Sequence, residues 1–274
     1  MGSGPGGTDV TARVRHAEPV MGTVVSFDVP AAARHDGSLD EAVRWLHWAD
    51  RVFSPYRPDS DVSRLADGAV TVERCVPEMA EVIEACAFVA ELSGGYFTDS
   101  PWGRFDPTGY VKGWAVERAA AILSATGSVS HLVNGGGDVQ CVGGRPDGTP
   151  VPGAAAPGRP VAPWRVGIAD PLRPGRLALV VEAADCGVAT SGTAERGAHI
   201  VNPRTGRPAA GLASLTVAGP SLARADACAT AAFAMGPALA RDWTESLDGY
   251  EAYAITETGE TWQTSGFAAR TAGC

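Results

Sequence analysis

Several features that mark other classes of protein are scarce in this 274-residue sequence. Its six cysteines form no C-x-x-C pair and no cluster with histidine, which argues against a zinc site and a disulfide framework. No run of about 18 apolar residues occurs, and the first residues lack the basic and apolar regions of a secretory signal. We therefore expect a cytoplasmic protein that is not inserted in a membrane.

Basic residues are outnumbered, and lysine is almost absent. The chain has 31 acidic and 22 basic residues and a formal net charge of −9, a balance that disfavours a nucleic-acid partner. Of the basic residues 21 are arginine, and Lys112 is the single lysine. Because the planar guanidinium and the compact ammonium are not interchangeable, Lys112 marks a candidate site that needs the ammonium.

Apolar residues make up 45% of the chain, enough to bury a large core, and glycine and proline punctuate it at turns. Several β-like runs are separated by turns too short to hold a crossover helix, so much of the sheet should be antiparallel. We expect an α+β fold, a mixed and largely antiparallel sheet with flanking helices. The predicted helices are about 39–53, 77–92, 112–127 and 222–235, and the predicted strands are 24–29, 130–134, 138–143, 164–169, 177–183, 214–219 and 250–256.

The last predicted helix carries a candidate metal site. Asp226 and Thr230 are four residues apart in ADACAT, so their oxygens project from one face, one turn apart. Two hard oxygens suit Mg²⁺. An isolated D-x-x-x-T is, however, more commonly a polar stripe on a helix, or a threonine bonded to its own backbone.

Three other segments combine polar residues with glycine. FDPTGYVKGWAVE places an acid, two glycines and Lys112 just before a predicted helix, where the helix dipole favours an anion such as a diphosphate. VNGGGD, which ends at Asp138, permits a hairpin turn or a close approach of the backbone to a ligand. In GAHIVNP, His199 is a candidate proton acceptor or a structural histidine, and its spacing does not decide between them.

Taken in order, these segments resemble the ApbE-type flavin transferases, also called FAD:protein FMN transferases. The resemblance covers the chain from about Val20 to Met235, so we expect a flexible segment over 1–19 and an ApbE-like domain over 20–274. The motifs that carry it are VMGT, FSPYRPDSDVSRL, GGYF, DPTGYVKGWAVE, VNGGGD, WRVGIADP, TSGTAERGAHIVNPRTGRP and SLTVAGPSLARADACATAAFAMG.

The resemblance implies that the chain binds FAD and that Mg²⁺ bridges its diphosphate. The family's metal ligands would be the Gly109 carbonyl, the Asp226 carboxylate and the Thr230 hydroxyl, and Asp226 and His199 would act in catalysis. The contacts to FAD would be Met21, Tyr56, Tyr96, Phe97, Thr98, Asp106, Lys112 and Val201.

The implied reaction is protein flavinylation. A threonine or serine hydroxyl of an acceptor protein attacks the FMN phosphorus of FAD, and AMP leaves. Two alternatives stay open: a Mg²⁺-dependent FAD pyrophosphatase that yields FMN and AMP, and a non-catalytic flavin-binding protein.

The sequence departs from the family pattern at several positions. Thr98 stands where an acid is usual, and the segment from Phe97 to Asp106 is shorter than in typical members. Ala66 replaces a common asparagine, and Glu117 replaces the usual aspartate. Members commonly carry a lipoprotein or Sec signal, and since none is visible here we expect a cytoplasmic acceptor.

Overall fold

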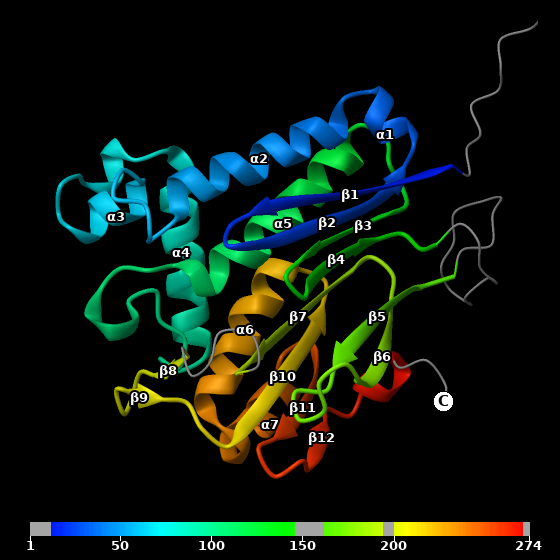
Figure 1. Cartoon of the computed structure of the whole chain (residues 1–274). Helices are drawn as coiled ribbons and strands as arrows, with labels where there is room; N and C mark the ends of the chain where they lie inside the picture. Colours follow the sequence, from blue (N-terminus) through cyan, green and yellow to red (C-terminus); the bar gives the residue numbers. More distant parts are fainter. Residues whose placement is uncertain (1–11, 146–161, 194–199, 271–274) are drawn as a thin grey trace, which may run out of the picture.

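A computed structural model describes residues 12–145, 162–193 and 200–270 of the chain. Its centre is an eight-stranded sheet in which neighbouring strands pair antiparallel, which confirms the expected α+β class (Figure 1). In spatial order the strands are β1 (Arg13–Val20), β2 (Thr23–Pro30), β3 (His131–Gly135), β4 (Asp138–Val142), β7 (Cys186–Gly192), β10 (Leu212–Gly219), β11 (Glu251–Thr256) and β12 (Thr261–Gln263).

Helices cover one face of this sheet (Figure 1). Two of them pack on its middle strands, α5 on β3 and β4, and α6 on β7 and β10. Short 3-10 turns lie at Val72–Arg74, Pro101–Gly103 and Phe267–Arg270. The helices are α1 (Ala32–His35), α2 (Ser38–Phe53), α3 (Asp61–Ala66), α4 (Pro77–Leu92), α5 (Thr108–Ala125), α6 (Leu222–Met235) and α7 (Pro237–Glu245).

A two-stranded ribbon covers part of the opposite face. Strands β5 (Trp164–Ala169) and β6 (Leu177–Ala183) pair antiparallel. Burial alternates strictly along β5. Trp164, Val166 and Ile168 therefore face a hydrophobic core between the ribbon and the sheet, to which β4 and β7 also contribute residues. A second ribbon, β8 (Val201–Asn202) and β9 (Arg207–Pro208), lies in the segment between β7 and β10.

Two glycines allow α6 to sit close to its neighbours. A Cβ atom built on Gly187 of β7 would lie 2.5 Å from the Cα of Leu222. One built on Gly113 of α5 would lie 2.8 Å from the Cβ of Asp226. Neither approach leaves room for a side chain. Glycine at these two positions therefore allows α6 to pack closely against both the sheet and α5.

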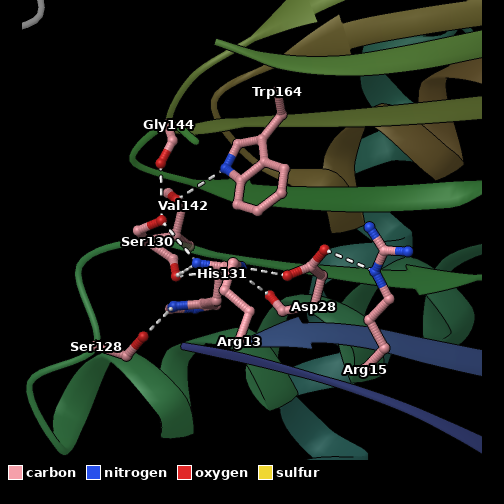
Figure 2. Close-up of polar contacts among 9 residues, drawn as sticks. All are labelled: Arg13, Arg15, Asp28, Ser128, Ser130, His131, Val142, Gly144 and Trp164. Carbon is pink, nitrogen blue, oxygen red and sulfur yellow. Dashed lines mark hydrogen bonds and ion pairs between the residues drawn. The ribbon is translucent and has the colours of Figure 1, made fainter. Parts of the chain in front are cut away.

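The N-terminal strand is tied to the rest of the sheet by Arg13 (Figure 2). Its guanidinium forms an ion pair with Asp28 of β2 and lies 3.3 Å from the hydroxyl of Ser130. The same group lies 5.1 Å from the ring centroid of Trp164 of β5, a cation–π contact. One side chain therefore joins β1 to the neighbouring strand and to the ribbon on the far face.

Several elements differ from the predicted ones. The short elements α1, α3, β8, β9 and β12 and the helix α7 were not predicted. Strand β1, apart from its last residue Val20, lies inside the segment 1–19 that was expected to be flexible, and its eight residues pair with β2 in full register. Strand β7 was not predicted, because CGVATSG contains two glycines and no aromatic residue. Helix α5 begins at Thr108 and not near Lys112, so Lys112 lies within the helix and not before it.

Among the described residues, no helix combines the length and the apolar character needed to cross a membrane.

Candidate functional site

Asp226 lies in an unusual place for a carboxylate. Eleven of the fourteen residues of α6 are buried, most of them alanine, and Asp226 is only 4% exposed. Its Oδ2 accepts a hydrogen bond of 2.9 Å from the backbone N–H of Gly113 in α5. A buried carboxylate in an apolar helix is costly unless it is bonded, so this contact fixes its position beside α5.

Thr230, one turn after Asp226, meets the first turn of α5. A Cβ on Gly109 would lie 3.8 Å from the Thr230 Oγ1 and 3.3 Å from the ring of Phe97, so the backbone of Gly109 packs directly against both. From the other side, the hydroxyl of Ser191 in β7 lies 3.3 Å from that of Thr230. The three expected metal-ligating residues therefore gather along one α5–α6 contact.

Lys112, also in α5, forms an ion pair with a residue of the sheet. Its Nζ lies 2.6 Å from the Oδ2 of Asp138, the first residue of β4. The Lys112 side chain is 22% exposed and that of Asp138 is fully buried. The other oxygen of Asp138 accepts the backbone N–H of Thr190 in β7 at 3.1 Å. The single lysine is thus partly exposed to solvent, while its counter-ion is buried and hydrogen-bonded within the sheet.

These contacts close a ring through four elements. Lys112 and Gly113 of α5 connect to Asp226 and Thr230 of α6, which connect through β7 to Asp138 of β4 and back to Lys112. Of the residues in this ring, Lys112, Asp226 and Thr230 were expected from the sequence as site residues. Asp138 was expected only at the end of a segment that permits a hairpin turn or a close backbone approach to a ligand, and Ser191 had no expected role.

Carboxylates accept hydrogen bonds from the first residues of both helices of the site, or from the residue just before them. The Oδ1 of Asp106 accepts the backbone N–H of Thr108 at 3.0 Å, which starts α5. The Oε2 of Glu117 accepts the Ser221 hydroxyl at 2.9 Å and the Ala223 N–H at 2.8 Å, which caps α6 from outside. The glutamate that replaces the usual aspartate therefore reaches the N-terminus of the helix that carries Asp226.

The residues expected to contact FAD occupy loops and element ends. Met21 lies in the β1–β2 turn with a φ of 55°, and the Thr98 Oγ1 accepts the N–H of Ser100 at 3.0 Å. The Tyr96 ring lies 4.5 Å from the guanidinium of Arg204, which follows β8 and its Val201. This contact brings the loop after α4 next to the β8–β9 ribbon.

Phe97 and Tyr56 differ sharply in exposure. Phe97 is 2% exposed and packs under Gly109, whereas Tyr56 is 91% exposed just after α2. A ring this open could stack on a planar ligand. His199, our candidate proton acceptor, lies outside the described residues.

The donor set at Asp226 fits Mg²⁺. Within the described part of the chain, no group of three or more His, Cys, Asp and Glu residues could hold a metal ion. Mg²⁺ is commonly held by only one or two carboxylates, with substrate phosphates and water completing its shell. One carboxylate, one hydroxyl and a backbone carbonyl beside an anchored lysine match that pattern.

The thiols and phenol near the site are held neutral. Burial raises the pKa of Tyr110, in the first turn of α5, to about 12, and that of Cys228 in α6 to about 12. Burial also raises the pKa of Cys86. None of these three groups is therefore activated as a nucleophile.

A comparison with known families matches the ApbE family over residues 21–100 and 98–254. The chain belongs to the ApbE family. Among curated relatives, an "FAD:protein FMN transferase" of Rhodobacter capsulatus is 29% identical over 82% of this chain, and one of Treponema pallidum is 29% identical over 85%.

The relatives differ in length from this ApbE-family chain. The match covers 40% of the Rhodobacter protein and 42% of one from Escherichia coli, but 82% of the Treponema protein. Two solved structures share the fold. The flavin transferase ApbE of Vibrio cholerae has a TM-score of 0.78 at 21% identity, with 94% of this chain and 99% of that one covered. The ApbE protein of Thermotoga maritima has a TM-score of 0.79 at 22% identity, with 96% and 100% covered.

Proposed function

We propose that this protein transfers the FMN part of FAD to a threonine or serine hydroxyl of an acceptor protein and releases AMP. The observation that carries the proposal is the ring of contacts that sets Lys112, Asp226 and Thr230 around one α5–α6 junction. The names of the curated relatives in the ApbE family support it.

In this proposal the chain's own residues mainly position the diphosphate of FAD. Lys112 offers the N–H donors of an ammonium group that keeps some access to solvent, while Asp226, Thr230 and the carbonyl of Gly109 would hold Mg²⁺. When bound, the metal would neutralise charge on the phosphates and polarise the bond that breaks. The proposed contacts to the remainder of FAD are Met21, Tyr56, Tyr96, Phe97, Thr98, Asp106 and Val201.

The chemical step is a displacement at phosphorus. The acceptor oxygen forms a bond to the phosphorus of FMN, and the bond from that phosphorus to the oxygen shared with AMP breaks. AMP leaves with the electron pair of that bond. His199 is our candidate to accept the proton of the acceptor hydroxyl. The flavin ring neither gains nor loses electrons.

The test is incubation with FAD, Mg²⁺ and a candidate acceptor, followed by a denaturing gel viewed for flavin fluorescence. A fluorescent acceptor band supports transfer, and mass spectrometry of that band should find FMN on a threonine or serine. Free FMN and AMP without an acceptor band would support the pyrophosphatase instead. FAD that is bound but unchanged would support a flavin-binding protein.

The acceptor can be sought in cells that make this chain. Proteins that retain flavin after denaturation should appear only when the active chain is present and disappear with the Asp226→Asn variant. A flavinylated peptide mapped by mass spectrometry would then identify the modified residue.

A further inference from the structure

Asp138 stands out as a buried charge that our assignment of metal and FAD contacts does not use. Its side chain is fully buried at the start of β4, directly after the turn formed by Gly136 and Gly137. Both turn glycines have positive φ, 61° and 97°, so the β3–β4 hairpin delivers Asp138 to a defined place. A carboxylate is retained in such a place only with good compensation.

Two partners from different elements provide that compensation. Lys112 of α5 approaches the Oδ2 to 2.6 Å, and the N–H of Thr190 in β7 approaches the Oδ1 to 3.1 Å. The backbone bond needs only an oxygen acceptor, which an asparagine would also supply. Of these two contacts, only the one with Lys112 therefore depends on the charge of Asp138.

Strand β7, which binds Asp138, also contacts a proposed metal ligand. Thr190 binds Asp138, and the next residue, Ser191, lies 3.3 Å from the Thr230 hydroxyl. Two consecutive residues of β7 thus contact the counter-ion of Lys112 on one side and the proposed metal ligand Thr230 on the other. A lysine on a flexible four-carbon stem needs such an anchor if its ammonium is to keep a fixed direction.

We propose that Asp138 is a positioning residue that sets the ammonium of Lys112 against the Asp226–Thr230 face and so determines where a nucleotide diphosphate binds. This inference rests on the proposed function for its substrate, but its contacts are independent of which reaction follows. Because the ion pair is neutral overall, its contribution is placement of hydrogen-bond donors and not added positive charge.

The first test uses the near-isosteric variant Asp138→Asn, with Lys112→Met and the double variant completing a cycle. We expect Asp138→Asn to lower the rate of flavin transfer at least tenfold and to weaken binding of ADP with Mg²⁺, measured by calorimetry. In the Lys112→Met background the same change should alter either quantity less than twofold, because the residue it acts through is gone. Equal losses in both backgrounds would overturn the proposal.

A matched control is Asp185→Asn. Asp185 also accepts a backbone N–H, that of Gly143 just after β4 at 2.7 Å, but it is exposed. This variant should keep both the transfer rate and the affinity for ADP. A loss equal to that of Asp138→Asn would indicate a general effect of removing a carboxylate from the sheet.

The second test does not require Lys112→Met to fold, and it reads out Lys112 directly. Since the chain has one lysine, protein labelled with ¹³Cε-lysine gives a single lysine side-chain NMR signal. In the wild type we expect this signal to be broad and to shift when ADP and Mg²⁺ are added. In Asp138→Asn it should become narrow and respond weakly, with the backbone spectrum retained.

An unchanged lysine signal in Asp138→Asn would overturn the inference, whether or not flavin is transferred. A wild type that binds ADP through Lys112 but transfers no flavin would instead contradict the proposed function alone.

Discussion

At the scale of single residues, the site depends on placing few charges in an apolar setting. Asp226 is a carboxylate in an alanine-rich helix, and Lys112 is the single lysine among 22 basic residues. The rarity of lysine made Lys112 visible in the sequence, and the four-residue spacing to Thr230 made Asp226 visible. Asp138 was not identified there as a site residue, because an aspartate after three glycines is equally typical of a hairpin turn.

Replacing Asp226 tests the metal site. Asp226→Asn keeps an oxygen that can accept the Gly113 N–H, so the α5–α6 contact should persist, but it removes the only carboxylate in the proposed ligand set. We expect Mg²⁺-dependent turnover of FAD to fall more than about a hundredfold, in the range seen for loss of electrostatic catalysis. The measurement is release of AMP against Mg²⁺ concentration.

The control for this variant is Asp242→Asn, on the exposed surface of α7. It should keep the wild-type rate and Mg²⁺ dependence. If Asp226→Asn retained full activity at ordinary Mg²⁺ concentrations, the assignment of the metal ligands would be wrong.

At the scale of elements, the site is formed where glycines of α5 let the side chains of Asp226 and Thr230 in α6 reach the α5 backbone. The helical periodicity of both segments predicted the helices, and α6 is observed as Leu222–Met235, as expected. The start of α5 was predicted about one turn late, because Thr108 and Gly109 are weak helix formers. In the structure the hydrogen bond from the Thr108 N–H to Asp106 supports this first turn.

Adding one methyl group at Gly113 should disturb this crossing. In Gly113→Ala the new Cβ would lie 2.8 Å from both the Cβ of Asp226 and the carbonyl oxygen of Leu222, so α6 must move. We expect a loss of about 1–3 kcal/mol in unfolding free energy from overpacking. Because Asp226 moves with α6, the transfer rate should fall about a hundredfold.

Chemical denaturation and transfer assays measure the two effects, with Ser124→Ala at an exposed position of α5 as the control. That variant should change neither. A Gly113→Ala protein with the wild-type rate would show that Asp226 does not depend on this contact.

His131 of β3 makes the fold sensitive to acid (Figure 2). Its Nε2 lies 2.9 Å from the carbonyl oxygen of Ala120, which can only accept, and its Nδ1 lies 2.9 Å from the Ser128 hydroxyl. Nε2 therefore carries a proton and is the donor to this carbonyl. Burial lowers the pKa of His131 from 6.5 to about 4.

The pH dependence follows from this lowered pKa. Between pH 6.5 and about 4 the unfolded chain binds a proton at His131 that the folded chain does not. The unfolding free energy should thus fall as the pH is lowered through this range, by about 3 kcal/mol from this residue, and the contribution should level off below it.

The measurement is urea unfolding of wild type and His131→Gln at several pH values. The difference between the two should shrink by the stated amount from neutral to acid pH, while His35→Gln, at an exposed position of α1, should follow the wild type. Parallel curves for wild type and His131→Gln would contradict the prediction.

At the scale of the whole molecule, the sheet joins parts of the chain that are far apart in sequence. Strands β4 and β7 are neighbours although 43 residues separate Val142 from Cys186. The N-terminal strand β1 lies at one edge and is secured through Arg13 to the ribbon that contains Trp164 (Figure 2).

Arg13 and Arg15 form a natural comparison. Both pair with Asp28, but the Arg13 side chain is 20% exposed and that of Arg15 is 88% exposed. Arg13→Met should lower the unfolding free energy by about 2 kcal/mol, since it leaves the partly buried Asp28 without its main partner. Arg15→Met should cost less than about 0.5 kcal/mol, as is usual for an exposed pair.

Urea denaturation of the two variants checks the comparison, and equal losses would show that the burial of Arg13 carries no extra stability.

The sequence alone determined the local features and the family: amphipathic helices, an antiparallel sheet joined by short turns, and motifs in the order typical of ApbE proteins. It also singled out Lys112, Asp226 and Thr230, because residue type and helical spacing are written locally. Only the tertiary structure decided that Asp138 meets Lys112 and that Ser191 meets Thr230. Those pairs join segments 26 and 39 residues apart, and their meeting depends on strand register and on the close packing at Gly113 and Gly187, which no local pattern encodes.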